Sequence, residues 1–121
     1  TLSLHDALPI FRKFTEKKLT EEQIQTFVKA AQAASTSSYV MAYTIIGVTD
    51  DEIKEQLRQV SGQSYVKENG HLFVFCADLY RHDIVSNMEN IDFTESLEST
   101  EKFMVTLIDT ALAAQNAAII V

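Results

Sequence analysis

The spacing of apolar residues near the N-terminus of this 121-residue chain predicts an amphipathic helix. Apolar side chains recur at helical intervals from Ile24 to Ala31, so one face of the segment is apolar. Thr20 and Gln23 have the spacing of a capping box, in which two side chains bond the free backbone groups at a helix start. We therefore expect a helix that begins after Thr20 and ends near Ala34, where a run of hydroxyl residues follows.

Two β-prone segments follow, and a second helix separates them. Residues 43–49 are rich in β-branched side chains, and residues 71–78, HLFVFCAD, are predicted to form a buried strand. The intervening helix is expected to start with Asp50 or Asp51 as its N-cap and to end at Gly62. Its inner face is predicted to be apolar, formed by Ile53, Leu57 and Val60.

The last third of the chain is predicted to be helical. Residues 79–88 have the periodicity of a short helix, whereas residues 90–99 are polar and ambiguous. From Thr100 to Val121 the pattern indicates a long helix that becomes apolar on nearly all sides, which is typical of a helix buried in a core or a subunit interface. The order helix, strand, helix, strand, helix, helix indicates an α/β or α+β protein, although two strands alone make a poor sheet.

Composition narrows the class of protein. Apolar residues make up 46% of the chain and charged residues 22%, which is ordinary for a soluble globular domain. The net charge of −7, with no basic cluster beyond the EKK near Lys17, argues against a nucleic-acid surface. The single Cys76 excludes an internal disulfide framework and fits a reducing cytoplasm, and no apolar run is expected to span a membrane. We expect a cytoplasmic protein that binds neither nucleic acid nor membrane.

Both ends of the chain are unusual. Residues 1–10, TLSLHDALPI, reproduce one reading frame of a common sequencing adapter, so we interpret them as an artefact and leave them out of the fold. The last residues, AAQNAAIIV, contain no signal that ends a helix. We therefore expect residues 11–121 to be part of a longer gene product.

Common catalytic and metal-binding motifs are missing from the sequence. It has no GxGxxG motif and no P-loop, and His71, Cys76 and His82 lack a standard metal-ligand spacing. Cys76 lies in an apolar segment, where an inert thiol is the simpler interpretation. The carboxylates of TDDE are best explained as helix caps. No catalytic residue and no metal site is assigned on these grounds.

The hydroxyl run Ser35, Thr36, Ser37 and Ser38 is the most informative feature, and it has two interpretations. Hydroxyls at a helix end usually form caps and turns, but they can also donate hydrogen bonds to a phosphate or a heterocycle. Arg12 could clamp a phosphate or be an ordinary surface charge. Gln63, just after a helix end, could read the edge of a heterocycle.

Six blocks in order decide between these interpretations: RKFT, AAQAASTSSY, IIGVTD, VSGQSYV, FVFCADLYRH and DTALAAQNA. Together they resemble the nitroreductase family, and more narrowly its flavin reductases and oxygen-insensitive NADPH nitroreductases. The resemblance covers residues 11–121. It implies an α+β fold, an α/β sandwich of the nitroreductase type, with helices packed on part of a mixed sheet. It also implies that the chain is the N-terminal half of an FMN-binding domain, truncated at its C-terminus.

The resemblance assigns cofactor-binding roles to Arg12, Thr36, Ser37, Ser38, Val40 and Gln63. By this likeness Arg12 grips the FMN phosphate, Gln63 binds the isoalloxazine or ribityl region, and Val40 forms an apolar wall. Tyr39 would lie beside the substrate pocket. Met41 departs from many relatives, which carry a glutamine or asparagine there, and the family's phosphate ligands before Arg12 and its later Gly-rich segment do not appear.

The implied function is an FMN-dependent NAD(P)H oxidoreductase. In this family NADPH or NADH reduces FMN, and a nitroaromatic, a quinone or free flavin then accepts the electrons in a ping-pong scheme. The resemblance also implies a homodimer. We expect the 121-residue chain by itself to be inactive. The alternative is a non-catalytic α/β ligand-binding or interaction domain, in which the serines are caps and Arg12 is a surface residue.

Overall fold

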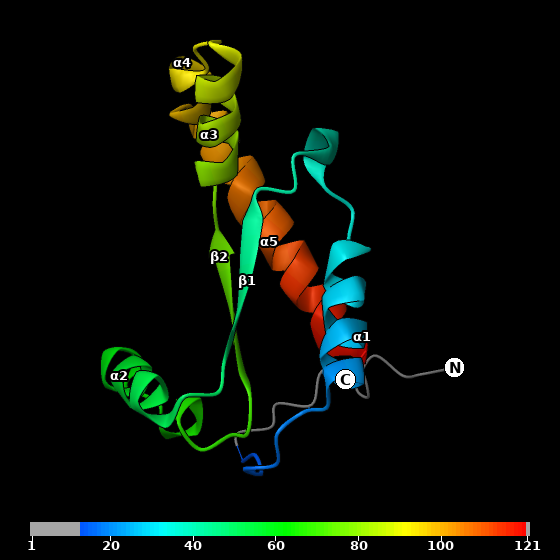
Figure 1. Ribbon diagram of the computed structural model, residues 1–121, viewed down its shortest axis with the longest axis vertical. Coiled ribbons are helices and arrows are strands. Elements are labelled where there is room, and N and C mark those ends of the chain that lie inside the picture. Colours follow the sequence, from blue (N-terminus) through cyan, green and yellow to red (C-terminus); the bar gives the residue numbers. More distant parts are fainter. Residues whose placement is uncertain (1–12, 121) are drawn as a thin grey trace. The chain divides into compact units, whose positions relative to one another are not determined.

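The computed structural model describes residues 13–120. The adapter interpretation of residues 1–10 and the assignment of Arg12 therefore lie outside the described residues. The elements in chain order are α1 (Glu21–Gln32), η1 (Ser37–Tyr39), β1 (Tyr43–Val48), α2 (Asp51–Ser61), η2 (Ser64–Val66), β2 (Leu72–Ala77), α3 (Tyr80–Glu89), α4 (Thr94–Leu97) and α5 (Thr100–Ile120), as Figure 1 shows.

The predicted helix caps are confirmed. The Thr20 N–H donates to Gln23 Oε1 at 2.9 Å and the Gln23 N–H donates to Thr20 Oγ1 at 3.3 Å, which is the reciprocal capping box. At α2 it is Asp50, of the two candidates, that accepts from the first-turn N–H groups. Gly62 closes α2 with φ of 69°, a left-handed conformation that costs glycine little.

The two strands pair with each other in a two-stranded sheet. The N–H of Asp78, just after β2, donates to the carbonyl of Ala42, just before β1, so the strands run antiparallel. Both lie within one residue of their predicted ends. The prediction that residues 71–78 form a buried strand is wrong in one respect, because β2 is only half-buried. Among the described residues each strand has one neighbour, which leaves part of its surface uncovered.

The described residues form two compact units. The first unit comprises residues 13–26 and 46–74, and the second comprises residues 27–45 and 75–120. In the first unit the ring of Phe14 meets Tyr65 edge-on at 6.4 Å. Gly70 lies against the Lys17 carbonyl so closely that a Cβ on Gly70 would come within 2.0 Å of it, which leaves room for no other residue.

The core of the second unit is built from small side chains. Ala31, Ala42, Ala113 and Ala117 are fully buried, and the Asn116 amide of α5 donates to the Ala30 carbonyl of α1 at 3.2 Å. Small residues let α1 and α5 approach closely enough for this side chain to bond a backbone carbonyl. Phe27 and Phe75 add an aromatic contact at 6.0 Å.

Helix α5 has two different faces, which corrects the expectation that its large apolar side chains are buried. Its buried residues are small or polar and recur at helical spacing: Thr106, Asp109, Thr110, Ala113 and Ala117. Its large apolar residues are exposed in the described chain: Phe103, Met104, Leu107, Ile108, Leu112, Ile119 and Ile120. By length and composition this 21-residue helix could cross a membrane, so the expectation that no apolar run is long enough was wrong. Core helices of soluble proteins meet the same criterion.

Helix α2 gives a second correction. Its predicted inner face is not covered, since Ile53 is 49% exposed and Val60 is 88% exposed. The buried residue of α2 is Lys54. Helix α2 packs on the short turn η2, which offers too little surface to cover an apolar stripe. The turns η1 and η2 and the one-turn helix α4 were not predicted, because elements this short carry no periodicity.

Candidate functional site

The strongest candidate site is the segment of residues 35–41, called here the hydroxyl segment, which contains η1. Three of its residues have positive φ, namely Ser38 at 51°, Tyr39 at 56° and Met41 at 48°. This left-handed region is uncommon for residues other than glycine and costs roughly 1 kcal/mol or more at each position. Backbone strain of this kind persists only where the surrounding structure holds it, and it clusters at functional sites.

The backbone of the hydroxyl segment is held by two helices. The Ser37 N–H donates to Asp109 Oδ1 of α5 at 3.1 Å. His82 Nε2 of α3 lies 3.0 Å from the Val40 carbonyl and donates to it, since a carbonyl can only accept. Directly after the segment, the Arg81 guanidinium reaches the Tyr43 carbonyl at 3.4 Å. These bonds fix the backbone and leave the side chains of the segment unused.

The hydroxyl groups themselves are unpaired in the described chain. Thr36 stands at the N-cap of η1 without a side-chain capping bond, and no bond within residues 13–120 involves the hydroxyl of Ser37 or Ser38. Ser37 and Ser38 are exposed and Thr36 is half-buried. The interpretation of these hydroxyls as helix caps is therefore not supported. They are free to donate to a ligand.

The two apolar residues of the site differ in exposure. Tyr39 is 83% exposed, so its ring is free to contact a bound molecule. Val40 is half-buried and lines a cavity of about 260 Å³ in the second unit. The other apolar residues of that cavity are Leu79, Val85, Phe93 and Leu97. Val40 thus has the surroundings expected of an apolar wall.

Gln63 lies in the first unit, whereas the hydroxyl segment lies in the second. Gln63 precedes η2 and is exposed, and its carbonyl accepts from the Val66 N–H at 3.2 Å. Arg12 lies outside the described residues. The convergence of Arg12, Ser37, Ser38 and Gln63 on one surface therefore stays a prediction.

Two ionisable groups next to the hydroxyl segment are perturbed. Burial raises the pKa of Tyr43, an effect that Arg81 opposes and Asp109 reinforces. Tyr43 is buried, and its hydroxyl has no partner among the described residues. A hydrogen bond from Thr44 and another from the Tyr80 N–H lower the pKa of Asp78. Asp78 is thereby held as a carboxylate that ties β1 to the start of α3.

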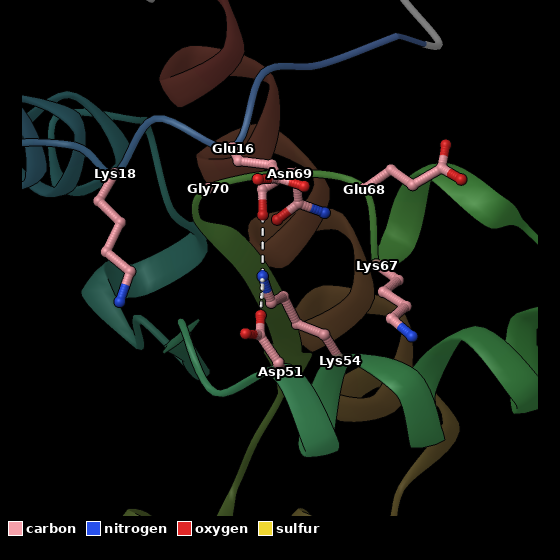
Figure 2. Close-up of a pocket in the computed structure, with 8 residues that line it drawn as sticks. All are labelled: Glu16, Lys18, Asp51, Lys54, Lys67, Glu68, Asn69 and Gly70. Atoms are coloured by element: carbon pink, nitrogen blue, oxygen red, sulfur yellow. Dashed lines mark hydrogen bonds and ion pairs between the residues drawn. The ribbon is translucent and has the colours of Figure 1, made fainter.

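The first unit contains a different kind of pocket, a charged cavity of about 510 Å³, which Figure 2 shows. Lys54 is 4% exposed, and its ammonium donates to Asp51 at 2.9 Å and to the Asn69 carbonyl at 2.8 Å. The hydrogen bond from Lys54 lowers the pKa of Asp51. The remaining charges around the cavity alternate in sign: Glu16, Lys18, Lys67 and Glu68. With three cations and three anions at its rim, this pocket selects no charged ligand.

A second charge cluster in the first unit is also self-contained. Glu55 accepts from Arg58 at 2.6 Å and from Lys67 at 3.0 Å. These bonds, with one from Gln59, hold the pKa of Glu55 far below its usual range. Such pairs stabilise a helix surface and leave no charge free for chemistry.

The possible metal ligands do not form a site within residues 13–120, where no three His, Cys, Asp or Glu side chains are placed to hold an ion. His71 belongs to the first unit and stacks on Phe73 at 4.5 Å. His82 belongs to the second unit and bonds Val40. Each histidine thus has a structural role.

Two residues of the site were missed from the sequence, Asp109 and His82. The available signal was the position of Asp109, a lone acid within the apolar run LIDTALAA. An acid at such a position is buried when the helix packs, and a buried acid needs a partner. His82 had no comparable signal, since it lies on a polar helix.

Comparisons with known proteins agree with the fold. No family model matches the chain. FMN reductase (NADPH) of Bacillus subtilis (strain 168) is 60% identical over 109 residues, which are 89% of this chain and 44% of that protein. The structure of the NfrA1 nitroreductase from B. subtilis matches with a TM-score of 0.90 and 57% identity, over 93% of this chain and 46% of that one. NADPH:FMN oxidoreductase from Vibrio harveyi, complexed with NAD+, matches with a TM-score of 0.80 and 35% identity, over 92% of this chain and 46% of that one.

The described residues thus have the α+β fold of the nitroreductases, as the sequence predicted. The chain is a homologue of NADPH-dependent FMN reductases and nitroreductases, and it spans less than half the length of the relatives that it matches. The resemblance read from the six sequence blocks is confirmed.

Proposed function

We propose that this chain is part of an FMN-dependent NAD(P)H oxidoreductase. One observation carries the proposal: the hydroxyls of Thr36, Ser37 and Ser38 are unpaired on a strained backbone that α3 and α5 hold in place. The resemblance puts FMN at this segment, and relatives at 60% identity include an FMN reductase (NADPH). Because the chain spans 44% of that relative, the activity of the whole protein is part of the proposal.

The residues present fit a flavin. FMN offers a phosphate, a ribityl chain and a ring edge rich in acceptors, and the free hydroxyls can donate to such groups. Val40 offers an apolar surface for the ring, and the exposed Tyr39 lies where an incoming substrate would meet the flavin. Gln63 and Arg12 are proposed to complete the site at the ring or ribityl region and at the phosphate. When bound, FMN supplies the redox chemistry, so the chain needs no acid–base residue of its own.

The substrates follow from the proposed class. NADPH or NADH is the proposed electron donor, and relatives of this chain include NADPH-dependent enzymes. A nitroaromatic, a quinone or free flavin is the proposed acceptor, reached in a ping-pong scheme that uses one flavin face twice. The site is proposed to act in the cytoplasm.

A homodimer is proposed for the whole protein. The exposed face of α5 carries large apolar residues, among them Phe103, Leu107 and Ile108, and exposed apolar surface of this kind marks a protein contact. Thr106, Asp109 and Thr110 face inward, so α5 has the polarity of a helix between two protein surfaces rather than one surrounded by lipid. Neither a membrane nor a nucleic acid is proposed as a partner.

The visible absorption spectrum tests this function. The reading frame would be extended in both directions from the source DNA, and the product would be expressed with FMN present and then desalted. A retained flavin spectrum that bleaches on addition of NADPH or NADH is the expected result. A folded, colourless product would contradict the proposal and favour a non-catalytic ligand-binding or interaction domain. The 121-residue chain alone is expected to bind FMN weakly and not to oxidise NAD(P)H.

A further inference from the structure

Asp109 is a buried acid whose presence needs an explanation. It is 2% exposed on the otherwise apolar helix α5. Its Oδ1 accepts one hydrogen bond, from the Ser37 N–H, and its Oδ2 has no partner among the described residues. A buried carboxylate with one bond costs free energy, and an apolar side chain of similar size would usually be more stabilising. The acid therefore does not serve stability alone.

The single bond of Asp109 reaches the place where the backbone is most strained. Ser37 directly precedes the left-handed Ser38 and Tyr39, and it lies 72 residues away from Asp109 in sequence. Asp109 bonds the backbone N–H of Ser37, so the hydroxyl of Ser37 is left free. His82 acts in the same way at the other end, where Nε2 bonds the Val40 carbonyl at 3.0 Å.

Both ends of the turn are thus fixed through backbone atoms. Without the bond to Asp109, the left-handed residues would relax toward ordinary backbone conformations, because each costs roughly 1 kcal/mol or more. Relaxation would turn the hydroxyls of Ser37 and Ser38 away from their present direction. A ligand that needs these hydroxyls would then have to restore the strained turn when it binds, which weakens its affinity.

We propose that Asp109 is a positioning residue of the flavin site, which holds the Ser37 N–H so that the Ser37 and Ser38 hydroxyls are set for the cofactor before it binds. This inference rests on the proposed function. Asp109 touches neither the hydroxyls nor the proposed cofactor, so its effect is transmitted through the backbone of the hydroxyl segment.

FMN titration of Asp109 variants, followed by quenching of flavin fluorescence in the product of the extended reading frame, tests the inference. Asp109→Ala removes the acceptor and is expected to raise the Kd for FMN about tenfold or more, the effect of losing a charge-assisted hydrogen bond. Asp109→Asn keeps a carbonyl oxygen for the Ser37 N–H and is expected to stay within about threefold of the wild type. This rescue by the conservative variant distinguishes positioning from general structural damage.

Thr110→Val provides the matched control. Thr110 is the next residue of α5, is 9% exposed, and bonds only the Thr106 carbonyl within its own helix. Its substitution disturbs the same buried face without touching the hydroxyl segment, so the Kd for FMN should not change. The urea midpoint of each variant is measured in parallel, and Asp109→Leu replaces Asp109→Ala if the alanine variant does not fold.

The possible results separate the two proposals. If the wild type binds FMN and Asp109→Ala binds it equally well, the positioning role is wrong and the proposed function stands. If Thr110→Val loses affinity as much as Asp109→Ala does, the effect is general damage to α5 and the inference is likewise overturned. If the wild type itself binds no FMN, the proposed function fails and the positioning role fails with it.

Discussion

The charged pocket around Lys54 and the hydroxyl segment use polar groups in opposite ways. In the pocket the Lys54 ammonium bonds both Asp51 and the Asn69 carbonyl. In the hydroxyl segment the backbone is bonded by Asp109 and His82, while the hydroxyls stay unpaired. The larger cavity therefore belongs to the region that satisfies its own charges. The region with free donors is strained and more open.

The difference shows how to distinguish a structural cluster from a binding site. Groups that serve stability are paired with each other, because an unpaired buried polar group costs free energy. Groups that serve a ligand are left unpaired where solvent can satisfy them until the ligand arrives, and their backbone is fixed beforehand. By this criterion pocket size alone would have selected the wrong region of this chain.

Substitution of Lys54 tests the structural side of the comparison and should have the largest effect. Lys54→Met keeps the buried stem and removes the ammonium, which leaves the Asn69 carbonyl without its donor. We expect the free energy of unfolding to fall by about 2 kcal/mol in urea denaturation. Affinity for FMN should be unchanged in the folded variant. Lys18→Met is the control, since Lys18 lines the same cavity but is exposed. A loss of FMN affinity in Lys54→Met with full stability would break the comparison.

The double variant Ser37→Ala and Ser38→Ala tests the binding side. The two hydroxyls make no bonds within the described residues, so the free energy of unfolding should stay within about 0.5 kcal/mol of the wild type. The Kd for FMN should rise about tenfold, the effect of two lost hydrogen bonds. Ser35→Ala, at the start of the same segment, should leave the Kd unchanged. Destabilisation without loss of affinity would show that these hydroxyls are structural.

Gly62 and Ser38 allow a paired test, because both have left-handed φ, of 69° and 51°. Gly62→Ala is expected to lower the free energy of unfolding by about 1 kcal/mol, since nothing lies within 4 Å of the added Cβ and only the backbone penalty remains. Ser38→Gly relieves the same penalty and should raise stability by up to about 1 kcal/mol while it weakens FMN binding. Thermal unfolding and FMN titration measure both. If Ser38→Gly instead bound FMN more tightly, strain at Ser38 would not belong to the site.

The smallest expected effect is a pH dependence from His71. Burial, then the charges of Lys18 and Lys54, lower the pKa of His71 in the folded chain. In the unfolded chain it titrates near 6.5, so as the pH falls below about 7 the unfolded state takes up the proton first. Stability should therefore decline from about pH 7 down to the lowered pKa and then level off. His71→Gln should remove this part of the decline, and identical pH profiles of unfolding for the two proteins would contradict the assignment.

The sequence predicted the long elements well, and the reason is local. Caps at Thr20, Asp50 and Gly62 specify where a helix starts or ends through neighbouring backbone groups alone, and all three are confirmed. The exposure of Val60 could not be predicted, because it depends on which surfaces lie nearby in the fold. For α5 the pattern predicted an apolar helix correctly but not that its small and polar face is the one buried here.

The candidate site was predictable only in part. The hydroxyls of Thr36, Ser37 and Ser38 could be selected from the sequence, since four adjacent hydroxyl residues at a helix end are unusual. Their backbone support could not, because Asp109 is 72 residues away and its contact with Ser37 exists only in the folded chain. The positive φ values of Tyr39 and Met41 were equally invisible, since neither residue type favours them.

The central claim is that the hydroxyl segment is a preformed part of a flavin site. A crystal structure of the extended product grown with FMN tests it most directly. The account predicts FMN with an oxygen or nitrogen atom within about 3.2 Å of the Ser37 or Ser38 hydroxyl. It also predicts that Ser38 and Tyr39 keep their positive φ and that the Ser37 N–H still bonds Asp109. FMN bound elsewhere, with these hydroxyls facing solvent, would contradict the account.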